Sequence, residues 1–472
     1  MLKKNEEYID VVSDVGSNGE GVIKRDNCVI FTPFVMLGEI VKYKILKVQK
    51  NIAYAKVLEI IEPSDYRVKP ICPVFTKCGG CQLQHVNYNT QLFIKRNNVQ
   101  NCFDKISGLN VDVEPVVPSD DVLGYRNKLQ LPVGNSENGT VIGFYAENSH
   151  RIIPILDCPI NPCWTKDIIR AFYRYIKNFN IKGYDSVTKT GELREITVKE
   201  IDSKLIITAV VLNKNIRGKK ELVEILKEEL NLEFSLFINV NDKDTNVIYG
   251  DEFIKLYGEN DYTSQMFGIK YKTGVLSFMQ VNKKVCQKLY KAVKDCVGES
   301  QASTVIDAYS GAGLMTALVS ENANKAIGIE IVSEAVECAN ELVKINDLED
   351  KITNYCGKCE EKLPKILEKE VGFDNKVTVI LDPPRKGVDV KVIESIKKCN
   401  IDKIIYVSCL PSSLARDVGL LTGALSYVDG KLVKTNAKNL DYNVEFVRPF
   451  DMFPQTKHVE TLVCLTRVKH NI

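Results

Sequence analysis

The chain has 472 residues, of which 44% are hydrophobic and 26% charged, and a formal net charge of +2 at pH 7. This length gives material for two or three domains with sizeable cores. The composition excludes a membrane protein, because no apolar run is long enough to cross a bilayer, and a near-neutral chain leaves any nucleic-acid binding to local patches.

The N-terminal stretch MLKKNEEYID lacks the apolar core of a signal peptide, so we expect a cytoplasmic protein. The chain contains 15 cysteines, which is many for a reducing compartment. An odd number of cysteines in a chain of this size argues against a disulfide framework and favours metal ligands or a catalytic thiol. Nothing in the sequence indicates a membrane or a protein partner, and we expect a monomer.

Residues 1–63 are predicted to form a small β-barrel. Short alternating apolar runs are separated by glycine-bearing turns, such as the turn that contains Gly19. One segment is crowded with lysines, which either solvate a strand face or contact RNA. These lysines are Lys42, Lys44, Lys47 and Lys50.

Cys72, Cys78 and Cys81 form a C-x5-C-G-G-C array, whose glycines let the backbone wrap closely around a bound centre. A tetrathiolate site needs a fourth ligand, and Cys158 and Cys163 follow downstream. Such a site holds either an iron–sulfur cluster or zinc, and the spacing does not decide between them.

Residues 64–265 are predicted to form an α+β domain. They contain many short strand-like runs and two segments with helical spacing, 164–178 and 217–230. The Arg-Asn-Lys stretch at 126–128 is expected to be exposed, where it contacts a phosphate backbone or forms a salt-bridged surface.

Strand-like and helix-like segments alternate in residues 266–472. Five apolar runs are each followed by a helical segment, which predicts a doubly wound parallel sheet. Residues 445–454 and 458–468 then predict two final strands. The expected fold is therefore multidomain, with an N-terminal β-barrel, a central α+β domain and a C-terminal Rossmann-like α/β domain.

The first strand of this sheet ends in Asp307-x-Tyr309-x-Gly311-x-Gly313, a turn that lets the backbone come close to a ligand. Glu330 ends the second strand, where a carboxylate accepts hydrogen bonds from ribose hydroxyls. The loop lacks the third glycine of the dinucleotide fingerprint and lies late in the chain, which favours S-adenosylmethionine over NAD.

The fourth strand ends in Asp382 of DPPRKG, where paired prolines remove backbone donors and fix the turn. Their rigidity aims Asp382 into the crevice beside the sheet. Arg385 and Lys386 hold a phosphate there or cap the strand end. By itself, the DPPR loop resembles the N/D-P-P-Y/F loop of amino-group methyltransferases.

The fifth strand delivers Cys409 to a turn before a helix. The run Ile404–Val407 predicts a buried strand, and Ser412 or Ser413 is expected as the N-cap. A thiol at this turn lies where open α/β sheets bind ligands, and helix N-termini lower thiol pKa values. The alternative is that Cys409 is one more small buried residue.

Glu460 brings a carboxylate into an otherwise apolar final strand. Burial of a carboxylate is costly and raises its pKa unless the group has a partner. Glu460 is therefore either functional or a paired structural acid. His458, close by, is expected to be structural or to transfer a proton.

Taken together, these motifs resemble those of the RNA uracil-C5 methyltransferases. The resemblance rests on FMQVN, DAYSGAG, DPPRKG, YVSC-x-P-x-x-LARD and MFPQTKHVE, and it covers nearly the whole chain. The cysteine array, together with residues 1–63, which resemble the RNA-binding TRAM module, narrows it to the ribosomal branch. That branch makes 5-methyluridine in large-subunit (23S) rRNA and carries a [4Fe-4S] cluster.

The resemblance implies a role for each motif residue. Cys409 is the nucleophile that adds to C6 of the uracil, Glu460 removes the C5 proton, and Asp382 contacts the uracil or orients the base. The residues implied to bind S-adenosylmethionine are Gln280, Tyr309, Glu330 and Asp382. The implied cluster ligands are Cys72, Cys78, Cys81 and Cys158.

The resemblance also implies that residues 91–119 pack on the C-terminal domain. In one respect the chain departs from the family, which usually has Asn or Asp after the catalytic cysteine, where this chain has Leu410. Three alternatives stay open, namely a tRNA uracil-C5 methyltransferase, an amino-group methyltransferase that uses the DPPR loop without a covalent step, and a non-catalytic RNA-binding iron–sulfur protein.

Overall fold

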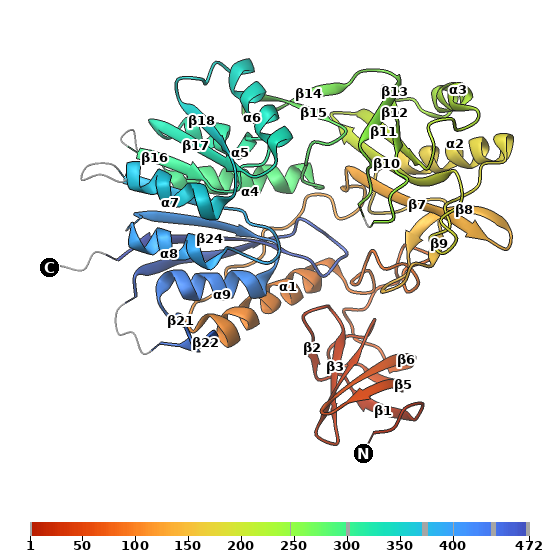
Figure 1. The fold of residues 1–472 in the computed structure, drawn as a ribbon. Helices are drawn as coiled ribbons and strands as arrows, with labels where there is room; N and C mark the ends of the chain where they lie inside the picture. The colour runs from red at the N-terminus through yellow and green to blue at the C-terminus, as the bar shows by residue number, and fades with distance from the viewer. Residues whose placement is uncertain are drawn as a thin grey trace.

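The computed structural model describes residues 2–245, 247–298, 303–370, 376–399, 401–435 and 440–468. Figure 1 shows an N-terminal sheet in red, a central sheet in orange, yellow and green, and a C-terminal sheet in teal and blue. No helix within these ranges is long and apolar enough to cross a membrane.

The N-terminal sheet has six strands in the order β1-β5-β6-β4-β3-β2. Side chains alternate between its faces, so that Val41, Tyr43 and Ile45 of one strand are buried against Ile23 and Ile30 of others. The predicted strand-rich N-terminal unit is therefore confirmed. Its strands are β1 (Glu7–Val11), β2 (Asp14–Val15), β3 (Gly21–Arg25), β4 (Cys28–Thr32), β5 (Ile40–Gln49) and β6 (Ile52–Glu62).

The helix α1 (Tyr88–Cys102) contacts α9 (Pro411–Thr422) of the C-terminal domain (Figure 1). It begins after Asn87, whose Oδ1 accepts a hydrogen bond from the main chain of Thr90 at 2.9 Å. A π-helical turn, Phe103–Ser107, follows it. This early part of the chain thus packs into the core beside the C-terminal sheet.

The central sheet has seven strands in the order β13-β12-β11-β10-β7-β8-β9, and α2 (Trp164–Phe179) and α3 (Lys219–Glu229) share its core. The helix α3 begins two residues later than the spacing predicts. Gly218 has a φ of 64°, and a Cβ there would lie 2.5 Å from the Phe179 ring. The strands are β7 (Lys128–Ser136), β8 (Gly139–Tyr145), β9 (Ile152–Pro154), β10 (Leu193–Ile201), β11 (Lys204–Val211), β12 (Phe234–Val240) and β13 (Glu252–Tyr257).

A hairpin of β14 (Asp261–Met266) and β15 (Ile269–Gly274) follows the central sheet. The predicted domain boundary between residues 265 and 266 falls inside this hairpin.

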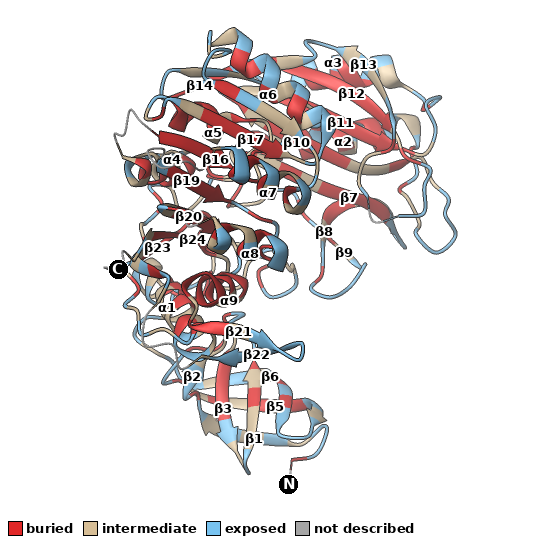
Figure 2. Ribbon diagram, turned by 60° about the vertical axis from the view of Figure 1, so that its left-hand side comes forward, coloured by how far each residue is buried: buried red, intermediate tan, exposed pale blue. Residues whose placement is uncertain are grey.

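The C-terminal sheet has seven strands in the order β18-β17-β16-β19-β20-β24-β23. The first five are parallel, and β24 runs antiparallel to β20. Alternate residues of β19 point to opposite faces of the sheet and pack in two different cores. Val379 packs with α7, α8 and α9, whereas Ile380 packs with α4 and α5. Figure 2 accordingly shows the central strands of this sheet as buried. The predicted Rossmann-like α/β fold is confirmed.

The strands of this domain are β16 (Ser303–Asp307), β17 (Lys325–Glu330), β18 (Ile352–Cys356), β19 (Lys376–Leu381), β20 (Lys403–Ser408), β21 (Leu425–Val428), β22 (Lys431–Lys434), β23 (Tyr442–Phe450) and β24 (Glu460–Arg467). Its helices, besides α9, are α4 (Lys283–Val297), α5 (Leu314–Ser320), α6 (Ser333–Ile345), α7 (Cys359–Glu370) and α8 (Val390–Lys398).

The prediction that the 126–128 stretch is exposed is wrong for Asn127, which is 8% exposed. Its main-chain N donates to the carbonyl of Val281 at 3.0 Å, and its Nδ2 donates to the carbonyl of Gln280 at 3.1 Å. Asn127 is therefore buried because it joins the start of β7 to a segment of the C-terminal domain.

A buried ion pair fixes the connection between β23 and β24. Lys95 Nζ on α1 lies 2.5 Å from Asp451 Oδ1, and it donates to the carbonyl of Phe453 at 3.0 Å. The side chains of Lys95 and Asp451 are 1% and 0% exposed. Because both charges are buried away from water, separating α1 from this connection would leave each charge without a partner. The ion pair therefore holds the two elements together.

The same connection is held at Gln455. Its main-chain N donates to Gln91 Oε1, and Gln91 Nε2 donates to Gln455 Oε1, both at 3.0 Å. The Gln455 carbonyl accepts hydrogen bonds from the main chain of Gln82 and Leu83, next to the cysteine array. The cysteine segment, α1 and the connection before β24 therefore form one packed unit.

We predict that Lys95→Met lowers the free energy of unfolding by about 3 to 5 kcal/mol, because it leaves the Asp451 carboxylate buried without its cation. Urea denaturation of the full chain measures this change. Lys291→Met is the matched control, since Lys291 forms an exposed ion pair with Asp295 at 2.7 Å. Such a pair contributes at most about 1 kcal/mol, and a similar loss in both variants would contradict the prediction.

Candidate functional site

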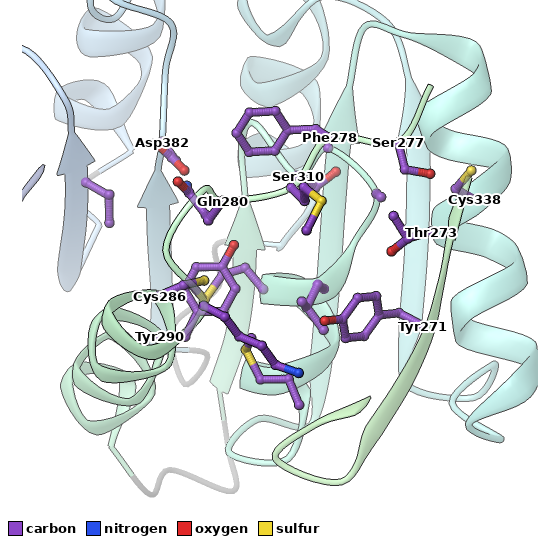
Figure 3. Close-up of a pocket in the computed structure, with 18 of the residues that line it drawn as sticks. Tyr271, Thr273, Ser277, Phe278, Gln280, Cys286, Tyr290, Ser310, Cys338 and Asp382 are labelled. Carbon is purple, nitrogen blue, oxygen red and sulfur yellow. The ribbon is translucent and has the colours of Figure 1, made fainter. Parts of the chain in front are cut away.

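A cavity of about 480 Å³ is lined by residues of both the central and the C-terminal domain. Its walls include the end of β10, the β14–β15 hairpin and the carboxyl ends of β16, β19 and β20. Figure 3 shows Phe278, Gln280, Tyr290 and Asp382 around this space. Open α/β sheets bind their ligands at this edge.

The glycine loop after β16 comes close to its neighbours. Gly311 and Gly313 have φ values of 52° and 81°, and a Cβ on Gly313 would lie 2.8 Å from a Cβ of α6. Glu330 holds this loop, because its Oε2 accepts a hydrogen bond from Gly311 N at 3.0 Å and its Oε1 accepts one from Val332 N at 2.9 Å. Tyr309 lines the cavity, whereas Glu330 is not among the lining residues. A contact between Glu330 and ribose stays a prediction.

Asp307, at the end of β16, lines the cavity and is 2% exposed. Burial raises the pKa of its carboxyl to about 6. Thr316 Oγ1, which donates to Asp307 Oδ2 at 2.7 Å, opposes part of this rise. Asp307 is therefore a buried acid with a weakened tendency to ionise.

The DPPRKG turn after β19 carries Asp382 into the cavity. Gly387 ends the turn with a φ of 83°, and a Cβ there would lie 2.3 Å from Asp417 Oδ2. Asp417 in turn accepts a hydrogen bond from Val388 N at 2.8 Å. Asp382 keeps solvent access through the cavity, but the surrounding protein raises its pKa to about 7, and the Asp307 carboxylate adds to this effect.

Cys409 lies in the turn between β20 and α9, which begins at Pro411. The prediction of a serine N-cap is wrong, because Leu410 is the N-cap and no side chain caps this helix. Pro411, at the first helical position, has no main-chain N–H and so leaves no donor there that needs a partner. Ser413 instead donates to the carbonyl of Arg385 at 2.7 Å, which ties the first turn of α9 to the DPPR loop.

The thiol of Cys409 has carboxyl groups and one cation around it. Burial raises its pKa, and the carboxylates of Glu460 and Asp382 raise it further. A hydrogen bond with the Arg385 guanidinium acts in the opposite direction. Arg385, for which the sequence indicated a phosphate ligand or a strand cap, is therefore the group that favours the thiolate. No sequence pattern marks this contact.

Glu460 is the first residue of β24 and is 4% exposed. Because β24 is antiparallel, it starts at the edge where the parallel strands end, and Thr461 pairs with Ser408. Burial holds the pKa of Glu460 well above its usual range, the Asp382 carboxylate raises it further, and Arg385 opposes both. A carboxylate with a raised pKa is a stronger base than an exposed one.

The structure therefore brings together most of the residues that the sequence singled out. The predicted site residues that line this one cavity are Gln280, Tyr309, Asp382, Cys409 and Glu460. Sequence reasoning missed Arg385 as a partner of the thiol and the contribution of the central domain, which supplies Asn127 and Glu200 to the wall.

A second cavity of about 390 Å³ adjoins the first. It is lined by all four predicted cluster ligands, Cys72, Cys78, Cys81 and Cys158. Cys163, the other possible fourth ligand, is exposed and is not in its wall. Arg385, Cys409 and Phe453 line both cavities, so these three residues form a shared wall.

The thiols of these four cysteines are the candidate ligands of a metal centre at the second cavity. Among the residues that the structure describes, no three His, Cys, Asp or Glu side chains are placed to hold a metal ion. Burial raises the pKa of all four thiols, to about 11 for Cys81 and about 12 for Cys158. Four thiols are a donor set that either an iron–sulfur cluster or a zinc ion binds.

His458 also lines the second cavity. Burial lowers its pKa to about 4, and the Arg385 guanidinium acts in the same direction. Its ring packs edge-on against Phe453, with centroids 5.9 Å apart. His458 is therefore neutral at physiological pH, which favours a structural role.

The chain is similar to known proteins in sequence and in fold. Residues 195–468 match the family model described as tRNA (Uracil-5-)-methyltransferase. The chain is 38% identical over 473 residues to an uncharacterized RNA methyltransferase of Clostridium acetobutylicum, covering 99% of this chain and 98% of that protein. It is 37% identical over 470 residues to another from Clostridium tetani, covering 98% and 97%.

The fold is similar to the crystal structure of Pyrococcus abyssi tRNA (uracil-54, C5)-methyltransferase in complex with S-adenosyl-L-homocysteine. The TM-score is 0.74 and the identity 24%, over 97% of this chain and 99% of that chain. At this level of identity the likeness concerns the fold.

We predict that Asp307 makes the protein less stable as the pH rises. Its folded pKa of about 6 exceeds the unfolded value of about 4, so the folded chain holds an extra proton between these values. The stability contributed by this proton is present below pH 4 and is lost as the pH rises through 6. Between those limits wild type should lose about 2 kcal/mol more than Asp307→Asn in urea denaturation. Asp295→Asn, at an exposed position, should behave as wild type, and equal slopes in all three proteins would contradict the prediction.

Proposed function

The chain belongs to the tRNA (uracil-5-)-methyltransferase family, and from this premise we propose that it methylates C5 of a uracil in structured RNA through a covalent bond between Cys409 and C6. S-adenosylmethionine supplies the methyl group. The chain is an enzyme, since its relatives are RNA methyltransferases.

The observation that carries this proposal is the meeting of a thiol, a cation and a buried carboxyl group at one edge of the sheet. Cys409 and Arg385 come from two separate turns and Glu460 from the start of β24, and all three line the same cavity as the glycine loop. A binding protein has no need to bury Glu460 beside Asp382, whose carboxylate raises the pKa of Glu460 further.

The chemistry explains why a thiol is needed. C5 of uracil is too weak a nucleophile to take a methyl group directly from a sulfonium. When the Cys409 thiolate adds to C6, C5 becomes enolate-like and forms a bond to the methyl carbon, while the bond from that carbon to sulfur breaks. Arg385 supports this step because it stabilises the thiolate.

The product is released by removal of a proton. After the transfer, C5 carries both a methyl group and a hydrogen. The Glu460 carboxylate takes this proton, the C5–C6 double bond re-forms, and the bond between Cys409 sulfur and C6 breaks. Asp382 raises the pKa of Glu460 and thereby makes it a better proton acceptor.

Four residues are proposed to bind S-adenosylmethionine. Gln280, Tyr309 and Asp382 line the cavity directly. Glu330 acts at least through the glycine loop, whose main chain it holds at Gly311.

We propose large-subunit rRNA as the substrate, because the cysteine array and the N-terminal sheet resemble those of the ribosomal branch. The target base must leave its stack to reach Cys409, which costs a few kcal/mol and least in an RNA loop. Transfer RNA is the second candidate, favoured by the description of the matching family and by the substrate of the Pyrococcus abyssi enzyme. A cytoplasmic monomer is consistent with both substrates.

We also propose that Cys72, Cys78, Cys81 and Cys158 hold a [4Fe-4S] cluster. All four line one cavity, and four thiolates are the ligand set of such a cluster. Bound there, the cluster would cross-link the cysteine segment to the loop between β9 and α2 through Cys158. The cluster would lie close to Arg385 and Cys409, because these two residues line both cavities.

We predict that Cys409→Ala lowers tritium release from RNA labelled at uracil C5 by roughly a thousandfold or more, because C5 is not activated without the adduct. The assay uses large-subunit rRNA and tRNA transcripts in parallel with S-adenosylmethionine. Cys356→Ala is the control, since Cys356 is exposed at the end of β18, and it should release tritium as wild type does.

Release from tRNA alone would move the substrate to the second candidate. Methyl transfer that survives Cys409→Ala would contradict the covalent mechanism and favour amino-group methylation at the DPPR loop. Bound S-adenosylmethionine without release from either RNA would contradict uracil-C5 methylation of these substrates.

We predict that protein purified without oxygen is brown, with equal amounts of iron and acid-labile sulfide, and that Cys78→Ala is colourless because the cluster loses one thiolate. Cys163→Ala should keep the colour, since Cys163 lies outside the cavity. A colourless wild-type protein that contains zinc would contradict the cluster.

A further inference from the structure

A buried lysine of the central domain binds a segment of the cofactor cavity. Lys199, on β10, is 4% exposed. Its Nζ donates to the carbonyl oxygens of Gly274 at 3.2 Å, Val275 at 2.5 Å and Ser277 at 2.5 Å. These three bonds use all three N–H groups of the ammonium.

The arrangement is not that of an ordinary ion pair. Within the described ranges, no salt bridge joins Lys199 to a carboxylate. The charged group that acts on it is Lys128, its pairing partner on the neighbouring strand β7. Burial lowers the pKa of Lys199 to about 7, and Lys128 lowers it further. The buried ammonium of Lys199 has lost its water and depends on the three carbonyl oxygens for hydrogen bonds. It therefore holds these carbonyl oxygens in place.

The bound segment leads directly into the cavity. Gly274 ends β15, and its N–H donates to Ser277 Oγ at 3.0 Å, which closes a turn. The next residues, Phe278 and Gln280, line the cavity, and Figure 3 shows both beside it. Beyond them, Asn127 donates to the carbonyls of residues 280 and 281.

The segment 274–281 is thus held at both ends by the central domain, at one end by Lys199 and at the other by Asn127. Residues 277–280 of the segment line the cavity. We propose that Lys199 is a positioning residue for cofactor binding, which holds segment 274–281 in the shape that Gln280 needs to contact S-adenosylmethionine. This inference rests on the proposed function, because it takes the cavity as the S-adenosylmethionine site.

The test is Lys199→Met, which keeps the length of the side chain and removes the three donors. We expect the Kd for S-adenosylmethionine, measured by calorimetry, to rise about tenfold, and amide exchange in segment 274–281 to become faster. The KM for S-adenosylmethionine should rise by about the same factor, with kcat at saturation within about twofold of wild type.

Lys403→Met is the matched control. Lys403 Nζ also binds a main-chain carbonyl, that of Cys296 at 2.6 Å, but it lies at the start of β20, whereas the cavity lies at the carboxyl end of that strand. It should leave both cofactor affinity and exchange in segment 274–281 unchanged. The only tryptophan of the chain, Trp164, donates to Glu200 next to Lys199 at 2.8 Å, so its fluorescence reports whether β10 stays folded.

If Lys199→Met does not fold, Lys199→Gln serves in its place, since its amide keeps two N–H donors. Its affinity for S-adenosylmethionine should be lower than that of wild type, by less than tenfold. Unchanged affinity and unchanged exchange in a folded Lys199 variant would overturn the inference. A wild-type protein that binds no S-adenosylmethionine would instead overturn the proposed function.

Discussion

The buried ion pair between Lys95 and Asp451 is the constraint on which the site depends. It joins α1, near the start of the chain, to the connection that leads into β24 and Glu460. Because both charges are buried, separation of the two elements would leave each without a partner, which costs several kcal/mol. Two hydrogen bonds between Gln91 and Gln455 also join α1 to this connection and, because hydrogen bonds are directional, they fix its orientation. The position of the carboxyl group in the crevice is therefore decided by residues outside the C-terminal sheet.

The same packing explains why two cavities meet at one thiol. The cysteine segment lies against the connection before β24, and that connection supplies Phe453 to both cavities. The DPPR loop supplies Arg385, which also lines both. Around Cys409, burial and two carboxyl groups outweigh the opposing effect of the Arg385 guanidinium, so the pKa of the thiol is raised. Because Arg385 is the group that opposes this rise, the charge of the DPPR loop influences how readily the thiol ionises.

The central domain builds part of the wall of the first cavity. Through Lys199 and Asn127 it binds the main chain of the segment that carries Gln280, so the wall is built from two domains. A shift of one domain relative to the other would break these hydrogen bonds. The shape of the cavity therefore depends on how the two domains are placed.

The sequence by itself determined the alternation of strands and helices in the C-terminal domain, since apolar periodicity is a local signal. It also placed Asp382 and Cys409 at the carboxyl ends of parallel strands, because every such end meets the same edge of a sheet. Only the tertiary structure decided which side chains meet there. The buried face of α1 carries Gln91 and Lys95, which no hydrophobic pattern marks, and their partners lie 364 and 356 residues away. Buried polar contacts of this kind are fixed by partners remote in the sequence, and they become visible only when the chain is folded.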